Sequence, residues 1–149
     1  MLPLEILIEA AGIKKLLGDW PARSRRHALL NDLAGVAAPV VYLRLPHYEF
    51  ETATLFGIVY VLEGSRLGAR VLLRYVLANN DPIFTENVRY LQHGVSEQLW
   101  SSFLRRLESV SDVSRNIHRA VEGALFAFSA FEQALHKASG PVGAGVPRG

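Results

Sequence analysis

Three glycines within one long helical segment are the feature of this sequence that most suggests a ligand site. Gly57, Gly64 and Gly68 interrupt an apolar stretch that otherwise repeats at helical period. Each glycine costs a helix about 1 kcal/mol relative to alanine, and offsets of seven and four residues place all three on one face. Either a planar ligand lies against this bare face and touches the backbone, or a neighbouring helix packs closely on it.

Charged residues lie beside the glycines and on the segment before them. Glu63 directly precedes Gly64, and its position in the middle of an apolar segment suggests a buried acid. A buried carboxylate requires a neutralising cation, and the candidates are Arg23, Arg25 and Arg26. Basic residues also form a patch that is either a solvated face or a surface for an acidic group: Lys14, Lys15, Arg23, Arg25 and Arg26.

The histidines could bind a metal only where a neutral imidazole faces a dry pocket. The sequence contains five of them: His27, His47, His93, His118 and His136. We expect His27 on a solvated basic face, and His93 at a helix end, where a cationic ring is favourable. The sequence has no metal-ligand pair at helical spacing, no phosphate loop and no hydrolase triad. It therefore predicts no metal site built from side chains alone.

The composition restricts the protein to a few classes. The 149 residues suit one domain, and 50% of them are hydrophobic, enough for a full core. The chain has no cysteine, which excludes disulfides and thiolate catalysis and fits a cytoplasmic protein. A net charge of +2 is too small to indicate nucleic-acid binding. The apolar runs are too short for a membrane span, and the order of the first residues is the reverse of a signal peptide.

The secondary structure that surrounds these residues is predicted to be almost entirely helical. Periodicity and capping residues predict helices over residues 3–17, 19–33, 48–78, 84–92, 96–110 and 113–138. Residues 36–47 contain two prolines and one short β-like run, which predicts an extended connector because a single strand has no partner. The expected organisation is one domain over residues 1–138 and a disordered, glycine-rich tail over residues 139–149.

Four patches of the sequence resemble one family. Residues 60–72, YVLEGSRLGARVL, are similar to the distal-helix signature of bacterial biliverdin-producing heme oxygenases, in which Glu-Gly-Ser precedes Leu-Gly-Gly. Residues 4–36 resemble the family's segment with Asp-Trp and an arginine pair. Residues 89–107 resemble its Tyr-x-x-x-Gly followed by Trp-x-x-Phe, and residues 124–135 resemble its final helix. The resemblance covers nearly the whole chain before the tail, in the family's order.

The resemblance implies a fold, a cofactor and a reaction. The expected fold is an all-α, heme oxygenase-like helical bundle. The expected activity is oxidative cleavage of heme to biliverdin, CO and iron, with an electron donor as partner. Ser65 matches the position that orders distal water and is the expected catalytic residue. The residues expected to contact heme are Gly64, Gly68, Tyr60 and Phe128. Ala69 replaces the family's second glycine, which predicts a narrower heme face.

One departure from the family concerns the first helix. In the family this helix carries the histidine that binds the heme iron, and it precedes the segment that resembles residues 4–36. None of the five histidines matches that position, so the fold is expected to be shortened at its N-terminus. Such shortening predicts an exposed apolar patch, covered in a homo-oligomer, and impaired turnover. The alternative to an enzyme is a non-catalytic tetrapyrrole-binding or protein-interaction module.

Overall fold

Every secondary-structure element is a helix in the part of the chain that the structure describes, residues 1–46 and 49–140 of a computed structural model. The helices follow in the order α1 (Leu2–Ala10), α2 (Ile13–Leu16), α3 (Trp20–Arg23), α4 (Arg26–Gly35), α5 (Thr52–Ala78), α6 (Pro82–Thr85), α7 (Arg89–Gln92), α8 (Leu99–Ser109), α9 (Ser111–Arg115) and α10 (Ile117–Ala138). No strand occurs in these ranges, which confirms the predicted all-α bundle.

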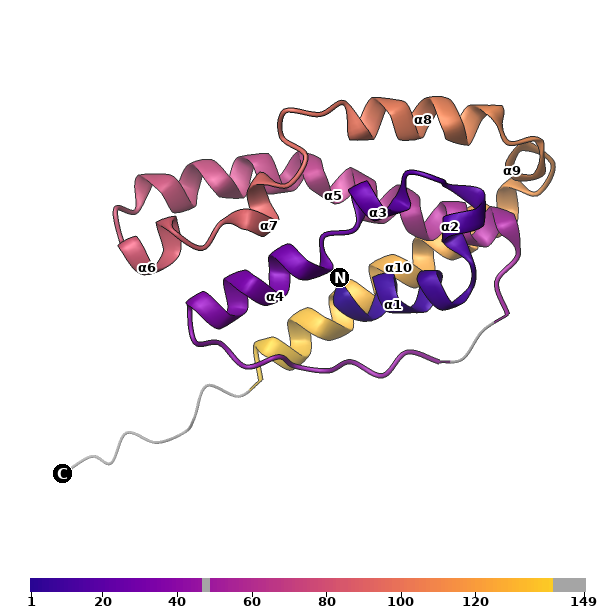
Figure 1. The fold of residues 1–149 in the computed structure, drawn as a ribbon. Helices are drawn as coiled ribbons and strands as arrows, with labels where there is room; N and C mark the ends of the chain where they lie inside the picture. The colour runs from indigo at the N-terminus through magenta and orange to yellow at the C-terminus, as the bar shows by residue number, and fades with distance from the viewer. Residues whose placement is uncertain (47–48, 141–149) are drawn as a thin grey trace.

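Helix α5 runs the length of the molecule and organises the other elements around itself (Figure 1). Its most extensive contacts are with α10, while α8 lies along one side and α7 contacts its second half. Helices α1 to α4 lie on the face that is nearest the viewer in Figure 1. The N-terminal half of α5 is therefore enclosed, and residues 53–59 are all buried.

The core forms where α5 meets its neighbours. Large side chains from distant segments are almost fully buried there, including Trp20, Phe56 and Phe103. Phe56 and Phe103 stack with ring centroids 6.2 Å apart. Burial of such aromatic surface is the main stabilising contribution to a domain of this size.

Several predicted helices are divided by local backbone breaks. Gly12 has φ +93° and separates α1 from α2, a conformation that glycine adopts without strain. Ser24, with ψ 131°, separates α3 from α4. Asn116 separates α9 from α10 and does not have helical angles. Periodicity alone continues through such breaks, because the apolar residues on either side still face the core.

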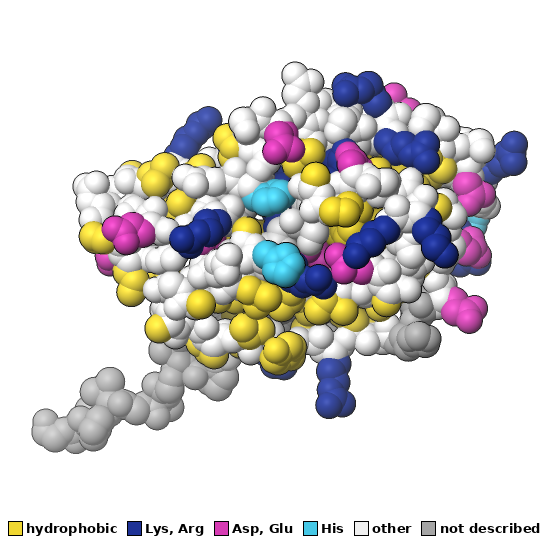
Figure 2. Space-filling model, in the orientation of Figure 1, with side chains coloured by type: hydrophobic (Ala, Val, Ile, Leu, Met, Phe, Trp, Pro, Cys, Tyr) yellow, Lys and Arg dark blue, Asp and Glu magenta, His cyan; other side chains and the backbone are white. Residues whose placement is uncertain are grey.

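The predicted connector is extended and non-helical over residues 38–46, as expected. Of the predicted tail, only Ser139 and Gly140 belong to the described residues, so the prediction of disorder lies outside them. No helix in the described part is long and apolar enough to cross a membrane. Hydrophobic side chains gather over the connector and α1 on the face shown in Figure 2, while cations are scattered.

Candidate functional site

The predicted glycine face divides into a packed part and an open part. A Cβ at Gly57 would overlap the carbonyl oxygen of Ala120 in α10, and one at Gly123 would overlap the carbonyl oxygen of Thr54. These glycines therefore allow two helix backbones to touch. At Gly64 a Cβ would make only ordinary contact with Trp100, at 3.6 Å, and at Gly68 it would meet no atom within 4 Å. Packing thus explains Gly57 but not Gly64 or Gly68.

The open part continues along α5 as an apolar stripe. Tyr60 is 43% exposed, Gly64 is partly exposed and Gly68 is exposed. Val71 and Tyr75 extend the stripe at helical spacing and are also exposed. Gly68 therefore faces open space and not a groove.

An apolar groove begins at one end of this stripe. It has a volume of about 200 Å³ and lies among α5, α8, α9 and α10. Its lining residues are Phe56, Gly57, Tyr60, Leu107, Val113, Ile117, Ala120, Val121 and Ala124. Tyr60 thus belongs both to the stripe and to the groove. Phe128 lies one helical turn beyond Ala124 on α10 and is 59% exposed.

Trp100 of α8 forms a side wall of the stripe that was not predicted from the sequence. Its ring centroid lies 5.3 Å from that of Tyr60 and 6.3 Å from that of Phe103. It is also the nearest side chain to Gly64. The signal that could have identified it is its place in the Trp-x-x-Phe motif, whose other aromatic residue, Phe103, is fully buried.

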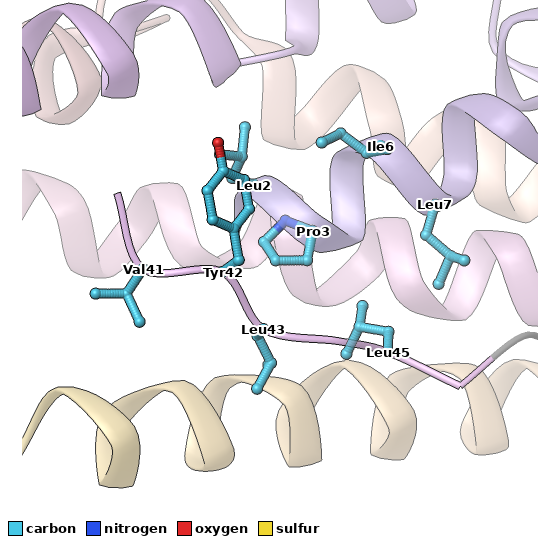
Figure 3. A pocket seen from close by; sticks show the side chains of 8 residues that line it. All are labelled: Leu2, Pro3, Ile6, Leu7, Val41, Tyr42, Leu43 and Leu45. Atoms are coloured by element: carbon cyan, nitrogen blue, oxygen red, sulfur yellow. The ribbon is translucent and has the colours of Figure 1, made fainter. Parts of the chain in front are cut away.

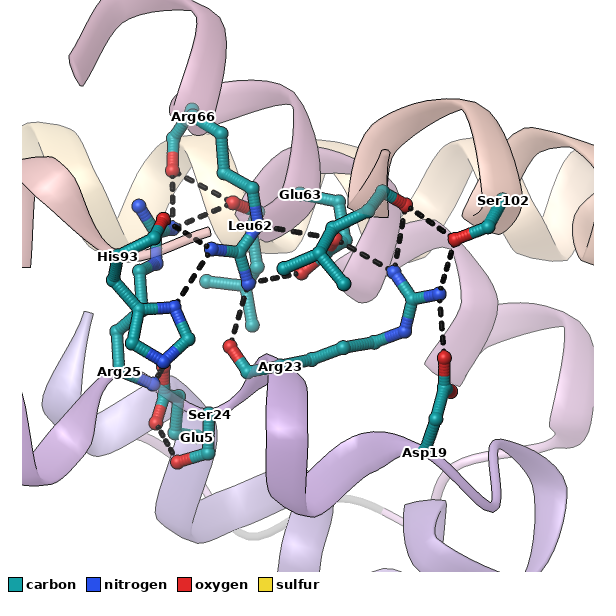
Figure 4. A network of polar contacts seen from close by, with 12 residues as sticks. Glu5, Asp19, Arg23, Ser24, Arg25, Leu62, Glu63, Arg66, His93 and Ser102 are labelled. Carbon is teal, nitrogen blue, oxygen red and sulfur yellow. Dashed lines mark hydrogen bonds and ion pairs between the residues drawn. The ribbon is translucent and has the colours of Figure 1, made fainter. Parts of the chain in front are cut away.

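A buried ionic network lies among α3, α5 and α8 (Figure 4). Glu63 accepts a hydrogen bond from Arg23 Nη1 at 2.8 Å and from Arg66 Nη2 at 2.8 Å. Arg23 also donates to the carbonyl oxygen of Leu99 at 2.7 Å and to Ser102 Oγ at 2.8 Å. The expectation that Glu63 is a buried acid neutralised by one of three arginines is confirmed for Arg23.

Arg25, which lies two residues after Arg23, contacts the predicted catalytic serine. Its Nη2 donates to Ser65 Oγ at 2.6 Å and to the carbonyl oxygen of Leu62 at 2.7 Å. Ser65 itself donates to Leu62 O at 2.7 Å. The Ser65 hydroxyl is therefore held on the turn of α5 that carries Gly64, and it is only partly buried.

The prediction of a basic surface patch is wrong for Arg23 and Arg25. Arg23 and Arg25 are each 2% exposed, whereas Lys14 and Lys15 are exposed. The reason is Glu5 of α1, whose carboxylate accepts hydrogen bonds from the backbone N–H of Arg25 at 3.0 Å and of Arg26 at 3.1 Å. This contact draws the segment inward, and nothing in the local charge pattern indicates it.

A second apolar pocket lies between α1 and the extended connector (Figure 3). It has a volume of about 240 Å³ and is lined by Leu2, Pro3, Ile6, Leu7, Val41, Tyr42, Leu43 and Leu45. None of these side chains is charged. The pocket offers apolar contact but no group for acid–base chemistry or for metal binding.

A comparison with curated proteins decides the family. The chain is 30% identical over 135 residues to a protein of Xanthomonas campestris pv. campestris (strain 8004) named heme oxygenase. The alignment covers 84% of this chain and 81% of that protein. The chain belongs to the heme oxygenase family. No protein-family model matches the chain, and no solved structure matches it significantly.

Ala69 follows Gly68 on α5. Ala69 is 5% exposed, because one residue along a helix turns the side chain by about 100°. Its methyl group therefore points into the protein. The expectation that Ala69 narrows the open face is wrong.

None of the histidines that the structure describes lines the groove of this heme oxygenase family member. His27, His118 and His136 are exposed, and His47 lies outside the described residues. His93 lies 3.1 Å from Arg66 Nη1 through its Nδ1. Arginine can only donate, so Nδ1 accepts and the proton of the neutral ring is on Nε2.

Burial, and then the charge of Arg66, lowers the pKa of His93 from its usual value. The prediction of a cationic ring at a helix end is therefore wrong for His93. Within residues 1–46 and 49–140, no group of three or more His, Asp or Glu side chains could hold a metal ion.

Proposed function

We propose that this protein binds heme on the open stripe of α5 and cleaves it oxidatively to biliverdin, CO and iron. The observation that carries the proposal is the contrast among the glycines. Gly64 and Gly68 weaken the helix yet leave free space in the protein, while Gly57 and Gly123 are explained by packing. A planar ligand that approaches the backbone supplies the missing reason for Gly64 and Gly68.

The chemistry of the surrounding residues fits a porphyrin. The macrocycle is flat and apolar, and Tyr60, Trp100 and Phe128 offer aromatic surface around the glycines. Its propionates require cations, and Arg70 lines a pocket together with Leu67 and Trp100 at the edge of the stripe. The residues that would hold heme are thus Gly64, Gly68, Tyr60 and Phe128, with Trp100 as an added wall.

The chain's own contribution to the reaction would be to bind heme and to order water on its distal side. Heme, once bound, supplies the activation of dioxygen, and an electron donor supplies the electrons. Ser65 would hold a water molecule, because Arg25 and the carbonyl oxygen of Leu62 fix its hydroxyl group. The aromatic wall would exclude further water from the reacting edge. A cytoplasmic location completes this proposal.

Filling the open stripe with a side chain is expected to abolish heme binding without harming the fold. In Gly68→Leu the new side chain would meet no protein atom at its Cβ, and loss of the glycine would stabilise α5 by about 1 kcal/mol. The same side chain would keep a macrocycle from the backbone. We expect the melting temperature to rise and the affinity for hemin, measured by absorbance titration, to fall at least about tenfold.

Gly18→Leu is the matched control, because Gly18 is exposed and a Cβ there also meets nothing within 4 Å. It should leave hemin affinity unchanged. If Gly68→Leu bound hemin as tightly as the wild-type protein, the stripe would not be the heme face. If the wild-type protein formed biliverdin with a reductase system, alanine substitutions at the five histidines would show which one, if any, binds the iron.

An exposed apolar stripe on α10 favours a second function, a protein-interaction module that pairs with its own copy. Ile117, Val121, Leu125 and Phe128 follow at helical spacing and are each more than half exposed. A contiguous apolar surface of this kind usually marks an interface, and a two-fold dimer is the simplest way to cover it.

Leu125→Glu is expected to convert such a homodimer into a monomer, because each copy would bury a charge against apolar surface. Sedimentation velocity at micromolar concentration measures the change. The exposed Lys137→Glu, which places the same charge beyond the stripe, serves as the control. A wild-type monomer at these concentrations would exclude the interaction module and leave the heme proposal intact.

A further inference from the structure

Tyr90 of α7 lies against Arg25, a buried arginine with no carboxylate partner among the described residues. Arg25 is 2% exposed, and no carboxylate oxygen of the described residues lies within 4.0 Å of its guanidinium group. Its partners are instead the Ser65 hydroxyl and the Leu62 carbonyl. Burial lowers the pKa of the Arg25 guanidinium from its usual value. A buried cation in this situation requires compensation from other groups.

The ring of Tyr90 provides this compensation. Its centroid lies 4.8 Å from Arg25 Cζ, within the range of a cation–π contact. Burial raises the pKa of the Tyr90 hydroxyl, and the neighbouring Arg25 cation opposes that rise. Tyr90 therefore lies against the guanidinium group that fixes the Gly64 turn of α5. The other charges that act on Arg25 are those of Arg66, Glu63 and Glu5.

The backbone of Tyr90 is itself fixed in place. Its N–H donates to Asp32 Oδ2 of α4 at 2.7 Å, and Asp32 is only 8% exposed. A four-residue helix such as α7 has little stability of its own. The buried carboxylate of Asp32 thus determines where the Tyr90 ring lies over Arg25.

We propose that Tyr90 is a positioning residue of the distal side. It holds the Arg25 guanidinium against Ser65 and the Leu62 carbonyl, and so fixes the Ser65 hydroxyl on the Gly64 turn of α5. This role rests on the proposed function. It goes beyond that function because Tyr90 itself lies behind Arg25 and Ser65 and acts on heme only through them.

Two substitutions separate the ring of Tyr90 from its hydroxyl group. Tyr90→Phe keeps the ring over Arg25 and removes only the hydroxyl group, while Tyr90→Leu removes both. Tyr42→Leu, on the exposed connector, is the control for loss of a tyrosine, since the Tyr42 ring is 71% exposed. Circular dichroism and thermal melting confirm that each variant is folded.

The first measurement uses the protein without heme. Nitrogen-15 NMR follows the exchange of the Arg25 guanidinium protons with water. We expect exchange to become about tenfold faster or more in Tyr90→Leu and to change little in Tyr90→Phe and Tyr42→Leu. Unchanged exchange in Tyr90→Leu would overturn the proposal, whatever the protein does with heme.

The second measurement uses the protein loaded with ferric heme. Loss of a proton beside the bound heme as the pH rises would add one negative charge and change the absorption spectrum. A fixed Arg25 cation favours the deprotonated form, so its displacement in Tyr90→Leu should raise the midpoint by about one pH unit. Tyr90→Phe, which keeps the ring over Arg25, should leave the midpoint nearly unchanged.

The outcomes distinguish this role from the proposed function. If the wild-type protein does not bind hemin, the proposed function fails and the role of Tyr90 at a heme site fails with it. If hemin binds and Tyr90→Leu does not move the midpoint, Tyr90 is a packing residue only. If Tyr90→Leu does not fold, Asp32→Asn decides, because it weakens the contact that fixes the Tyr90 backbone, and unchanged Arg25 exchange in that variant would overturn the proposal.

Discussion

Replacing Glu63 by leucine is expected to lower the free energy of unfolding by about 3–5 kcal/mol. The substitution leaves Arg23 and Arg66 as buried cations, with side chains that are 1% and 6% exposed. Both guanidinium groups would lose a carboxylate at 2.8 Å, and no other carboxylate in the described part is close enough to reach Arg66. Urea denaturation followed by circular dichroism measures the loss.

The size of this effect is set by burial and not by the number of ion pairs. Asp19 also pairs with Arg23, at 2.7 Å, but its side chain is 51% exposed. Asp19→Asn should therefore cost about 1 kcal/mol or less. If Glu63→Leu and Asp19→Asn destabilised the protein equally, the network would behave as a surface feature, contrary to its geometry.

The sequence indicated the acid of this network but only part of its surroundings. Glu63 stands out because a carboxylate in the middle of an apolar helix needs a partner, and Arg23 was among the predicted candidates. Arg66 was missed, although it lies three residues from Glu63 on the same helix, a spacing at which side chains meet. Arg25 was placed in a basic patch, and its burial was not predicted. This burial depends on a contact with Glu5, which lies twenty residues earlier in the chain.

The fold was predictable at the level of helices and less so at their ends. Periodicity identified every long helix, since apolar residues recur wherever a helix faces the core. It could not identify the break at Ser24, because that residue's extended backbone depends on a contact between its hydroxyl group and Glu5 at 2.6 Å. Breaks created by such long-range contacts have no local signal.

The glycine face shows the same division between local and long-range information. Spacing alone correctly placed Gly57, Gly64 and Gly68 on one side of α5, but it could not tell which of them meets another helix. That depends on α10, whose small residues face α5. A signal was present in the sequence, since Ala120, Gly123, Ala127 and Ala130 form a row of small residues at helical spacing.

Alanine substitution is expected to lower the free energy of unfolding at the glycines packed against a helix backbone and to raise it at the open ones. In Gly57→Ala the new methyl would overlap the carbonyl oxygen of Ala120 and lie 3.0 Å from the backbone nitrogen of Ala124. A helix backbone cannot rotate away as a side chain can, so α5 and α10 must separate. We expect a loss of about 3 kcal/mol in the free energy of unfolding. Gly123→Ala should cost a similar amount, because its methyl would overlap the Thr54 carbonyl.

Gly64→Ala is the control on the same helix face. Its methyl would lie 3.6 Å from Trp100, an ordinary contact, and the gain in helix propensity is about 1 kcal/mol. Guanidinium denaturation of the three variants should therefore show two destabilised proteins and one stabilised protein. A Gly57→Ala variant as stable as the wild-type protein would mean that the helices are not in backbone contact, and Gly57 would then belong with Gly64 and Gly68 to a ligand face. The expected difference of about 4 kcal/mol between Gly57→Ala and Gly64→Ala thus tests where packing ends and the open stripe begins.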